Sequence, residues 1–398
     1  MTSTTAAELT FAPAPGHTPD VEYAVAHRIG RVRLNRPRAL NSLTTDMCVS
    51  LLFQLRAWAV DDGVGAVFIE GAGDKGLCAG GDVRALRELI LAGEQEEVLR
   101  FWQEEYQLNA LIADYPKPYV AWMDGVVMGG GVGISAHGSK RLVTERAKVA
   151  MPETIIGFFP DVGGLYYLAH APGELGTHVA LTGLPVGPAD AVVLGVADGV
   201  VAQGDKERVL ADLAAGLEAS RPDGAEPSSA ERSGAARSGE DVEPSSEVAE
   251  PDGEDVEPDG GDEAAQEEAQ VAPVSELEAQ RGWIDECYAG RDATQILRRL
   301  REHADPAARA AGQAIAARSP HSVVVTLEAL RRAADMDVHQ VLAQDTRLGR
   351  HFAAHPDFVE GVRALLVDKD NAPRWADASV ADVDPTQVLA AFDHHSEN

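Results

Sequence analysis

Three short segments carry residues whose types and spacing could perform chemistry. The sequence MPETIIGFFPDVGG at residues 151–164 places two carboxylates, Glu153 and Asp161, eight residues apart in an apolar, glycine-rich run. Two glycine clusters precede it, CAGGD at residues 78–82 and MGGGVG at residues 128–133. Glycine lets a ligand approach the backbone closely, and backbone N–H groups stabilise a developing oxyanion while a carboxylate attacks or activates water. In this order the three segments favour acyl transfer.

The glycine clusters are suited to presenting backbone N–H groups. Gly81 comes at the start of a helical pattern, where a free N–H and the positive end of a helix dipole are expected. Gly129, Gly130 and Gly131 would each cost roughly 1 kcal/mol relative to alanine inside a helix, so close helix packing or a ligand against the backbone must compensate. A plain strand-to-helix turn is the alternative for the first cluster. Neither cluster has the spacing of a phosphate-binding lysine loop or a dinucleotide fingerprint.

The two carboxylates are the candidate catalytic groups. Each follows a proline and could simply cap a helix. Phe158 and Phe159 lie between them, so a shared apolar pocket explains the pair better. Apolar surroundings raise the pKa of a carboxyl group, and a second carboxylate raises one of the pair further. One carboxyl could then stay protonated while its neighbour is ionised.

Other polar residues near these segments have plainer explanations. His137 lies in an apolar segment and is predicted to be structural rather than a base. Cys78 has no histidine partner at a defined spacing, so we expect it to pack rather than to act as a nucleophile. Asp82 is expected to cap a helix or to orient its loop.

An α/β fold must position these segments. Strand pairs alternate with helical patterns along the first half of the chain, which is typical of an α/β core. From Ser275 onward the pattern is helical again. The predicted core elements are two short strands within residues 23–34, a helix over 41–59, buried strands over 64–70 and 119–123, and a helix over about 205–217.

The composition divides the chain into a core, an insert and a helical region. Residues 221–274 contain 17 Asp and Glu against three Arg, with six Pro, six Gly and no aromatic residue. Such a segment cannot bury enough apolar surface to offset its ordering entropy, so we expect a disordered, solvated linker rather than a docking tail. The predicted organisation is a flexible tail (1–20), a catalytic core (21–218), a disordered acidic low-complexity insert (219–274), a C-terminal helical region that completes the fold (275–392) and a tail (393–398).

Charge and cysteine content bound the partners and the setting. The formal charge is −30, of which −14 lies in residues 221–274, so the remainder is still acidic at −16 and disfavours nucleic acid or an anionic membrane as partner. The three cysteines lack metal-ligand spacing and cannot all pair, which favours a reduced, cytoplasmic setting and no metal site. Residues 1–20 show no secretory signal. The apolar run at 179–202 is broken by proline and aspartate, so no membrane span is expected.

The motifs resemble those of the crotonase (enoyl-CoA hydratase/isomerase) superfamily. At this level the similarity rests on LNRPRALNSL at residues 34–43, the AGGD cluster, and PYVAWMDGVVMGGGVG at 118–133. The resemblance covers about residues 21–218 and 275–392 and leaves the acidic insert unmatched. The motifs that are similar to the 3-hydroxyisobutyryl-CoA hydrolases within the superfamily are EEYQLN at 104–109, SAHG at 135–138, MPETIIGFFPDVGG, ALTG at 180–183 and DFVEGVRALLVDKDNAPRW at 357–375.

The resemblance implies a fold, a substrate class and a set of site residues. The fold would be a crotonase-type spiral of strand-strand-helix repeats with a C-terminal helical region, and the substrates would be acyl-CoA thioesters. The N–H groups of Gly81 and Gly130 match the oxyanion hole. Coenzyme A is then part of substrate and product, with no separate cofactor and no metal. Family members often associate through their C-terminal helices, so a homo-oligomer is an expected partner.

A departure from the hydratase pattern favours hydrolysis. Hydratases that resemble the chain use two glutamates; the first of those positions is Gly133 here, and the second is Glu153. Hydrolases carry an aspartate at the position of Asp161, where hydratases have a small residue. The expected reaction is therefore 3-hydroxyisobutyryl-CoA plus water to 3-hydroxyisobutyrate plus CoA, a step of valine catabolism. A neighbouring acyl group such as 3-hydroxypropionyl stays open.

The expected roles follow from the same resemblance. Glu153 attacks the thioester carbonyl to give a mixed anhydride, or it activates a water as general base. Asp161 binds the substrate hydroxyl or assists proton transfer to it, and Glu105 helps to hold that end unless it lies on a solvated helix face. Arg84 and Arg87 face the CoA phosphates or lie on an exposed helix face. The predicted substrate-binding set is Glu105, Gly81, Gly130, Asp82 and Arg84.

Two other functions stay open at this point. One is an enoyl-CoA hydratase or isomerase of the same superfamily, which hydrates an unsaturated acyl-CoA instead of releasing free thiol. The other is a non-catalytic CoA-binding scaffold whose acidic insert recruits a basic partner. A scaffold would not need both carboxylates and the glycines together.

Overall fold

The computed structural model describes residues 9–220 and 274–393, which belong to one compact unit. Of the insert predicted to be disordered over residues 219–274, residues 221–273 lie outside this description, as does all but the first residue of the predicted C-terminal tail, whereas Ala219 ends a helix. The predicted flexible tail at residues 1–20 is partly ordered. Ala12 pairs with Tyr23 through two backbone hydrogen bonds of 3.0 and 2.8 Å, and Ala14 is buried. The packed core therefore begins before residue 21.

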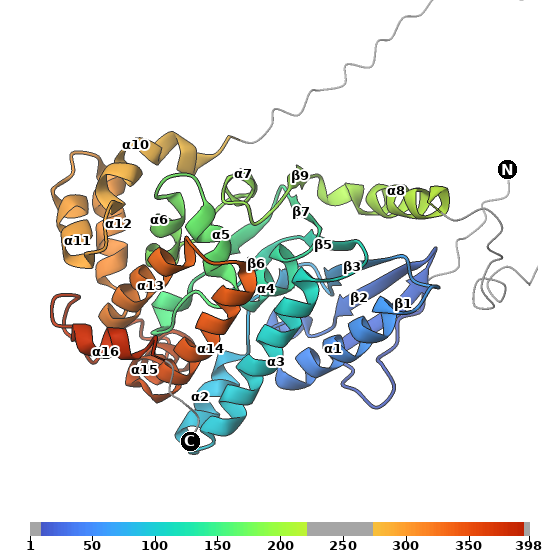
Figure 1. Ribbon diagram of the computed structural model, residues 1–398, viewed down its shortest axis with the longest axis horizontal. Coiled ribbons are helices and arrows are strands. Elements are labelled where there is room, and N and C mark those ends of the chain that lie inside the picture. Colours follow the sequence, from blue (N-terminus) through green and yellow to red (C-terminus); the bar gives the residue numbers. More distant parts are fainter. Residues whose placement is uncertain (1–8, 221–273, 394–398) are drawn as a thin grey trace, which may run out of the picture. The chain divides into compact units, whose positions relative to one another are not determined.

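The strands form two sheets, and Figure 1 labels all the strands of the larger one. The larger sheet has the order β1-β2-β3-β5-β7-β9, and the smaller has the order β4-β6-β8. From β3 onward consecutive strands alternate between the two sheets, and helices return the chain after each pair, which confirms the predicted strand-strand-helix spiral. All pairs except the β1/β2 hairpin are parallel. The strands are β1 (Val21–Ala26), β2 (Ile29–Leu34), β3 (Ala66–Gly71), β4 (Gly76–Cys78), β5 (Tyr119–Met123), β6 (Val126–Met128), β7 (Lys140–Thr144), β8 (Lys148–Ala150) and β9 (Gly199–Val201).

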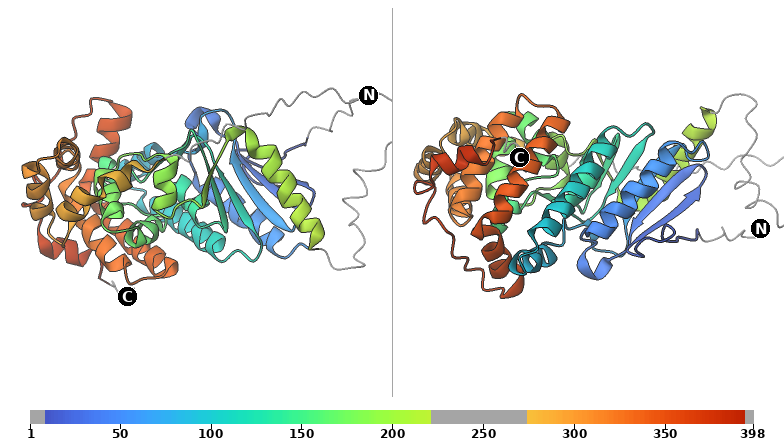
Figure 2. Two further views of the ribbon diagram at one scale, coloured as in Figure 1. Left: turned by 90° about the horizontal axis from the view of Figure 1, so that it is seen from above. Right: turned by 60° about the horizontal axis from the view of Figure 1, so that its bottom comes forward.

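The larger sheet is covered on both faces. Along β3, Val67 and Ile69 belong to the main hydrophobic core, whereas Phe68 between them joins a second cluster with residues of α8 (Lys206–Ala219). This is the two-residue alternation of a strand, and burial of both faces explains the continuous apolar run in the sequence. Figure 2 shows α8 on one side of the sheet, with α1 (Thr45–Ala59) and α3 (Gln95–Ala113) on the other.

Helix α1 begins later than the helix predicted over residues 41–59. Leu40 and Asn41 adopt left-handed backbone conformations with φ of 52° and 55°. The side chain of Thr44 then accepts a hydrogen bond from the N–H of Met47 and caps the first turn. The other helices of the core are η1 (Pro37–Ala39), α2 (Val83–Leu91), α4 (Gly130–Ala136), η2 (Glu153–Ile156), α5 (Gly164–His170), α6 (Leu175–Thr182), α7 (Pro188–Val193) and η3 (Gln203–Asp205).

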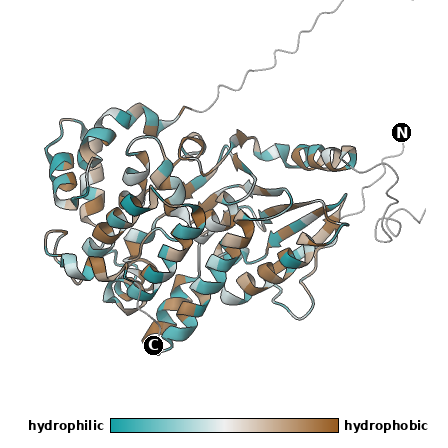
Figure 3. Cartoon of the chain, viewed as in Figure 1, coloured by the Kyte–Doolittle hydropathy of each residue, from teal (hydrophilic) through white to brown (hydrophobic). Residues whose placement is uncertain are grey.

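The chain from residue 274 to 393 is helical, as predicted, and packs on the core. Helix α13 contacts α5, α14 contacts α3, and α15 contacts both η2 and α2. The helices show hydrophilic and hydrophobic residues interleaved along their length, as expected when one face is buried (Figure 3). No helix among the described residues is long and apolar enough to cross a membrane. The helices of this region are α10 (Glu276–Tyr288), α11 (Ala293–Glu302), α12 (Pro306–Ala316), α13 (Pro320–Ala333), α14 (Val338–Ala354), α15 (Pro356–Val362), η4 (Arg363–Val367) and α16 (Pro385–Ala390).

Candidate active site

A cavity of about 270 Å³ lies where the two glycine clusters meet the carboxylates. Its wall contains Gly81 and Gly130 together with Glu105, Glu153 and Asp161, so five of the predicted site residues come together. Two others, Asp82 and Arg84, do not line this cavity. The rest of the wall is largely apolar and includes Trp102, Phe158, Phe358 and Leu366.

The backbone around Gly81 directs its N–H away from the neighbouring strand-like segment. The N–H of Leu43 donates to the carbonyl of Gly80, and the N–H of Asp82 donates to the carbonyl of Leu43, both at 2.8 Å. Gly81 lies between the two residues that make these bonds and pairs with Leu43 in parallel. In such a pairing the N–H of the middle residue points away from the partner segment. Gly81 also lines the cavity, so we infer that its N–H is available to a ligand there.

The second glycine cluster brings another N–H to the same place. Gly129 has a φ of +50°, a backbone conformation that is strained for a residue with a side chain. Gly130 is the first residue of α4. An N–H in the first turn of a helix has no intrahelical acceptor and is free for a ligand. A Cβ atom at Gly130 would lie 3.4 Å from the nitrogen of Gly81 and would collide with the carboxyl of Glu105. Only glycine leaves room for both backbone and carboxylate here.

Glu153 turns its carboxyl toward the glycine loop rather than capping a helix. It is the first residue of η2, follows β8 and is 7% exposed. A Cβ atom at Gly129 would lie 2.7 Å from Oε1 of Glu153, and Oε2 has no hydrogen-bond partner among the described residues. Burial, and then the charge of Asp161, hold the pKa of Glu153 well above its usual value. A basic or nucleophilic oxygen is therefore directed at the backbone that would polarise a carbonyl.

Asp161 faces the same cavity and does not cap the following helix either. Gly163 occupies the N-cap position of α5, and no side chain caps that helix. Asp161 is 5% exposed, and its Oδ2 accepts a hydrogen bond of 2.7 Å from the hydroxyl of Tyr106. Burial raises the pKa of Asp161 to about 7, although the hydrogen bond from Tyr106 acts in the opposite direction.

Glu105 is buried, which excludes the solvated helix face that was the alternative for it, whereas its role in holding the hydroxyl end of the acyl group stays a prediction. It lies in the middle of α3, is 2% exposed, and its Oε1 has no hydrogen-bond partner among the described residues. Burial, and then the charge of Asp161, raise the pKa of Glu105 well above its usual value. A protonated Glu105 could donate a hydrogen bond into the cavity, and an ionised one could accept a bond from a hydroxyl group.

Sequence reasoning did not identify two polar neighbours of this site. Tyr106, beside Glu105 in the EEYQLN motif, holds Asp161. Asp345 on α14 is fully buried and accepts a hydrogen bond of 2.8 Å from the N–H of Gly163. The motif position was a usable signal for Tyr106, whereas nothing local in the sequence distinguishes Asp345.

The position of the missing hydratase glutamate is physically filled. A Cβ atom at Gly133 would lie 2.7 Å from the Cβ of Val162 and 2.8 Å from the Nδ2 of Asn109. Both distances are far below van der Waals contact, so a longer side chain at Gly133 does not fit without displacing its neighbours. The second acid of a hydratase pair therefore has no place here.

Asp82 and the two arginines hold neighbouring elements together. Asp82 caps α2 through the N–H of Ala85 and pairs with Arg36 at 3.0 Å, which confirms the predicted capping role. The guanidinium of Arg84 donates to the carbonyl of Leu366, and Arg87 donates to that of Val359 at 3.2 Å. These bonds tie α2 to the C-terminal helices. The roles of Asp82 and Arg84 in substrate binding stay predictions.

His137 and Cys78 have the structural roles predicted for them. The Nε2 of His137 lies 2.8 Å from the carbonyl oxygen of Val162, and Nδ1 lies 3.1 Å from the hydroxyl of Tyr167. Burial lowers the pKa of His137 to about 4, so it is neutral at pH 7. Burial likewise raises the pKa of the Cys78 thiol to about 12, which keeps it protonated and unreactive.

One cluster of metal-ligating residue types lies among the described residues, away from the cavity. It consists of His321, His355 and Asp377, whose candidate ligand atoms lie within 4.8 Å of one another. The two imidazole rings are stacked with centroids 4.0 Å apart and an angle of 11° between their planes. The lone pair of an imidazole nitrogen lies in the ring plane, so parallel stacked rings do not point at a common ion. We assign no metal site to this cluster.

The chain matches a known enzyme family over nearly its whole length. The family model described as "Enoyl-CoA hydratase/isomerase" matches residues 29–392. The chain is 36% identical over 380 residues to the "3-hydroxyisobutyryl-CoA hydrolase, mitochondrial" of Rattus norvegicus, covering 94% of this chain and 90% of that protein. The protein of the same name from Homo sapiens is 35% identical over 354 residues, covering 89% of this chain and 83% of that protein.

Solved structures show the same fold. A carnitinyl-CoA dehydratase from Mycobacterium thermoresistibile superimposes with a TM-score of 0.77 at 42% identity and covers 94% of this chain and 97% of its own. An enoyl-CoA hydratase from Rhodobacter sphaeroides 2.4.1 superimposes with a TM-score of 0.78 at 33% identity, with the same coverage of both chains. The spiral of strand-strand-helix repeats is thus common to these proteins and the present chain.

Proposed function

The chain belongs to the enoyl-CoA hydratase/isomerase family, and on this premise we propose that it is a thioester hydrolase that converts 3-hydroxyisobutyryl-CoA and water to 3-hydroxyisobutyrate and free CoA. One observation carries the proposal: a buried oxygen of Glu153, without a hydrogen-bond partner in the part of the chain that the structure describes, lies beside two glycine loops in one apolar cavity. Relatives named as hydrolases of this thioester, similar over most of their length, support it. The reaction would serve valine catabolism.

The glycine loops would polarise the thioester carbonyl. Its oxygen would lie between the N–H groups of Gly81 and Gly130, which receive the negative charge that develops when the carbonyl carbon is attacked. One such donor is typically worth ~2.7–4 kcal/mol of transition-state stabilisation, and it acts without reorganisation because the backbone is held in place. The apolar wall strengthens this interaction by excluding water.

Glu153 would supply the attacking oxygen by one of two routes. Its carboxylate either adds to the carbonyl and expels the CoA thiolate, leaving a mixed anhydride that water cleaves, or removes a proton from a water that attacks directly. Hydroxylamine can attack either carbonyl of an anhydride at Glu153, so it leaves the hydroxamate either on that side chain or on the released acyl group. A hydroxamate on Glu153, found by peptide mass mapping after a hydroxylamine quench, would therefore establish the anhydride route, because direct attack by water gives none.

Asp161, Tyr106 and Glu105 would hold the hydroxyl end of the acyl group. An ionised Asp161 would accept a hydrogen bond from the substrate hydroxyl as well as the one from Tyr106, and Glu105 lines the same cavity with an oxygen that has no partner within residues 9–220 and 274–393. A site built to bind a hydroxyl discriminates strongly against an acyl group that lacks it, because its buried polar atoms are then left unpaired. The proposed substrates are therefore small 3-hydroxyacyl thioesters.

Hydration or dehydration is the second candidate, because the two solved structures are a dehydratase and a hydratase. The packing at Gly133 counts against it. In the hydratases that the chain resembles, a second glutamate occupies this position, but Val162 and Asn109 leave no space for one here. The cavity then offers Glu153 and Asp161 as its acid–base pair, an arrangement that suits thioester cleavage.

The decisive measurement is release of free thiol from a panel of 3-hydroxyacyl-CoA esters, run beside hydration of an unsaturated acyl-CoA. We expect thiol release without hydration, and a loss of at least about 100-fold in kcat for Glu153→Gln, the size typical of a removed general base. Glu96→Gln, the same change on the exposed side of α3, is the matched control. Full turnover by Glu153→Gln, or hydration without thiol release, would contradict the proposal.

The proposal also includes the cellular compartment of the protein and its self-association. The three cysteines are free and buried, in keeping with the reduced cytoplasmic setting that we propose. Self-association through the C-terminal helices is likewise a proposal, which sedimentation of the full chain would test. A scaffold function would require the acidic insert. Turnover that survives deletion of residues 221–273 would favour the enzyme.

A further inference from the structure

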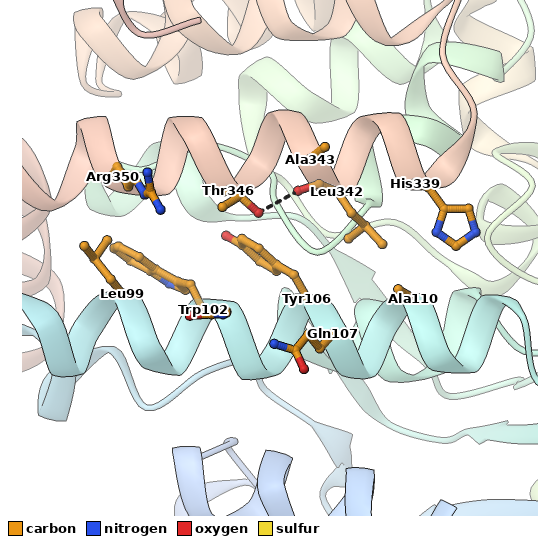
Figure 4. Close-up of a pocket in the computed structure, with 11 residues that line it drawn as sticks. Leu99, Trp102, Tyr106, Gln107, Ala110, His339, Leu342, Ala343, Thr346 and Arg350 are labelled. Carbon is orange, nitrogen blue, oxygen red and sulfur yellow. Dashed lines mark hydrogen bonds between the residues drawn. The ribbon is translucent and has the colours of Figure 1, made fainter. Parts of the chain in front are cut away.

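A second cavity of about 370 Å³ lies directly behind the proposed active site. It is a groove between α3 and α14 (Figure 4). Helix α3 contributes Leu99, Trp102 and Tyr106, whose side chains point toward α14, and α14 contributes residues such as Leu342 and Thr346. Nothing in the proposed reaction uses this space.

Of the residues that the structure describes, Trp102 is the one that lines both cavities. Its side chain is almost fully buried, with 4% of the residue exposed. The indole stacks on Phe158 at 4.9 Å with an angle of 19° and contacts Phe358 edge-on at 6.1 Å. Helix α14 also approaches the indole, so closely that a Cβ atom at Gly349 would lie 3.2 Å from the ring. The indole is therefore a fixed partition between the active-site cavity and the groove.

We propose that Trp102 determines the length of acyl group that the enzyme accepts, an inference that rests on the proposed thioesterase function. Glu105 lies one turn further along α3 and Asp161 is held by Tyr106, so the hydroxyl end of the substrate is placed beside the indole. An acyl chain that extends beyond this point meets the ring. Removing the ring joins the cavity to the groove and gives a longer chain an apolar path between α3 and α14.

The test compares chain-length profiles of the wild type and Trp102→Ala. Thiol release is measured with 3-hydroxybutyryl-, 3-hydroxyhexanoyl- and 3-hydroxyoctanoyl-CoA, and the ratio of kcat/KM for the longest to the shortest ester is the readout. One methylene that an apolar pocket cannot accommodate lowers kcat/KM by about 10-fold or more. The longest ester carries several methylenes that meet the ring in the wild type, so Trp102→Ala should raise the ratio by at least about 10-fold. Leu99→Ala, which removes a groove residue outside the active-site cavity, should leave the wild-type ratio unchanged.

A binding measurement separates this proposal from the proposed function. Alkyl-CoA thioethers of the same lengths are not hydrolysed, and their affinities for wild type and variant are measured by calorimetry. If the wild type binds the short thioether but cleaves no thioester, the hydrolase assignment is overturned. The dependence of affinity on chain length still tests the role of Trp102 in that case. If Trp102→Ala does not fold, Trp102→Leu, which also removes the ring, takes its place. An unchanged length profile in both readouts would overturn the role of Trp102.

Discussion

Four buried carboxyl groups, Glu105, Glu153, Asp161 and Asp345, influence one another's ionisation. Burial is the main reason that the pKa of each is raised, and the charge of Asp161 raises the pKa of the other three further. A low-dielectric site does not hold several negative charges at once, so protons leave the cluster in steps that belong to it as a whole. The proposed roles of Glu153 and Asp161 both require the ionised form, and the pKa of Asp161 is raised to about 7, so activity should depend on pH near neutrality.

We expect kcat/KM to fall as the pH drops below about 7, the raised pKa of Asp161. Tyr106→Phe removes a hydrogen bond that stabilises the carboxylate of Asp161, so the midpoint of this acid limb should move to higher pH by about one to two units, given the ~1.5–3 kcal/mol of a hydrogen bond to a charged group. Tyr115→Phe is the control, because its hydroxyl donates to the carbonyl of Leu55 at 2.8 Å, outside the cavity. A midpoint that is equal in Tyr106→Phe and wild type would show that this hydrogen bond does not tune the site.

The packing at Gly133 gives a second prediction for a single residue. Gly133→Ala should lower the free energy of unfolding by about 1–3 kcal/mol, because its Cβ would lie 2.7 Å from the Cβ of Val162. Gly282→Ala in α10 meets no atom within 4 Å and should instead raise it by about 0.5–1 kcal/mol through helix propensity. Chemical denaturation of both variants checks the pair. Equal effects at the two positions would mean that Gly133 is not tightly enclosed.

Among the elements, α3 contributes most to the chemistry of the cavity. Trp102, Glu105 and Tyr106 lie at positions i, i+3 and i+4 of this helix and therefore share one face. That face is turned inward because α1 and α14 pack against the same helix. One amphipathic helix thus supplies a wall, a carboxyl group and the hydrogen bond to Asp161.

The turn that carries Asp161 is held from α4 and α14. Val162 has a φ of 53°, a left-handed conformation that costs energy for a β-branched residue. His137, at the end of α4, contacts its carbonyl oxygen at 2.8 Å, and Asp345 on α14 accepts from the N–H of Gly163 at 2.8 Å. Two bonds from separate helices thus fix the strained peptides that follow Asp161.

His137→Phe should therefore affect both stability and activity. Loss of the bond to the Val162 carbonyl should lower the free energy of unfolding by about 1–3 kcal/mol, and a displaced Asp161 should lower kcat/KM on the order of ten- to a hundred-fold. His178→Phe is the control, since His178 is partly buried and also hydrogen-bonded, to the hydroxyl of Tyr288 at 2.9 Å, but lies outside the cavity. A similar loss of kcat/KM in both variants would mean that His137 acts only through stability.

For the whole molecule, two groups of titratable residues have opposite effects on the free energy of unfolding as the pH falls. Burial lowers the pKa of His137, His178 and His351 to about 4 and that of His321 to about 3. Each histidine contributes stability above its unfolded pKa of about 6.5 and loses that contribution as the pH falls toward its folded pKa. The site carboxyls have raised pKa values, so their contribution is complete at low pH and is lost as the pH rises.

His321→Asn isolates one of these contributions. Between pH 7.5 and 5.5 the wild type should lose about 1.4 kcal/mol of unfolding free energy relative to this variant, because only the wild type must keep the ring unprotonated. Urea unfolding at both pH values measures the difference. The control is His27→Asn in the exposed β1–β2 turn, where asparagine suits the left-handed backbone. No change in the difference across this range would mean that His321 is protonated as readily in the folded chain as in the unfolded one.

Much of the fold and the central pair of the candidate site could be predicted from the sequence. The strand at 119–123, the strand pair in 23–34 and the helical C-terminal region follow from hydrophobic periodicity, which is a local property. The glycine loops and the segment with Glu153 and Asp161 could also be found, because a short motif fixes backbone conformation and side-chain type together. Their roles in catalysis stay predictions until the variants are measured.

The sequence by itself determined which loops can expose a backbone N–H and which carboxylates are candidates to lie near them. Only the tertiary structure decided that Glu105 is buried rather than solvated, that Val162 and Asn109 close the space at Gly133, and that Asp345 reaches Gly163 from 182 residues away. Whether a polar side chain on a helix faces solvent or a cavity depends on which elements pack on that helix. That packing is set by contacts between distant parts of the chain, which no local pattern records.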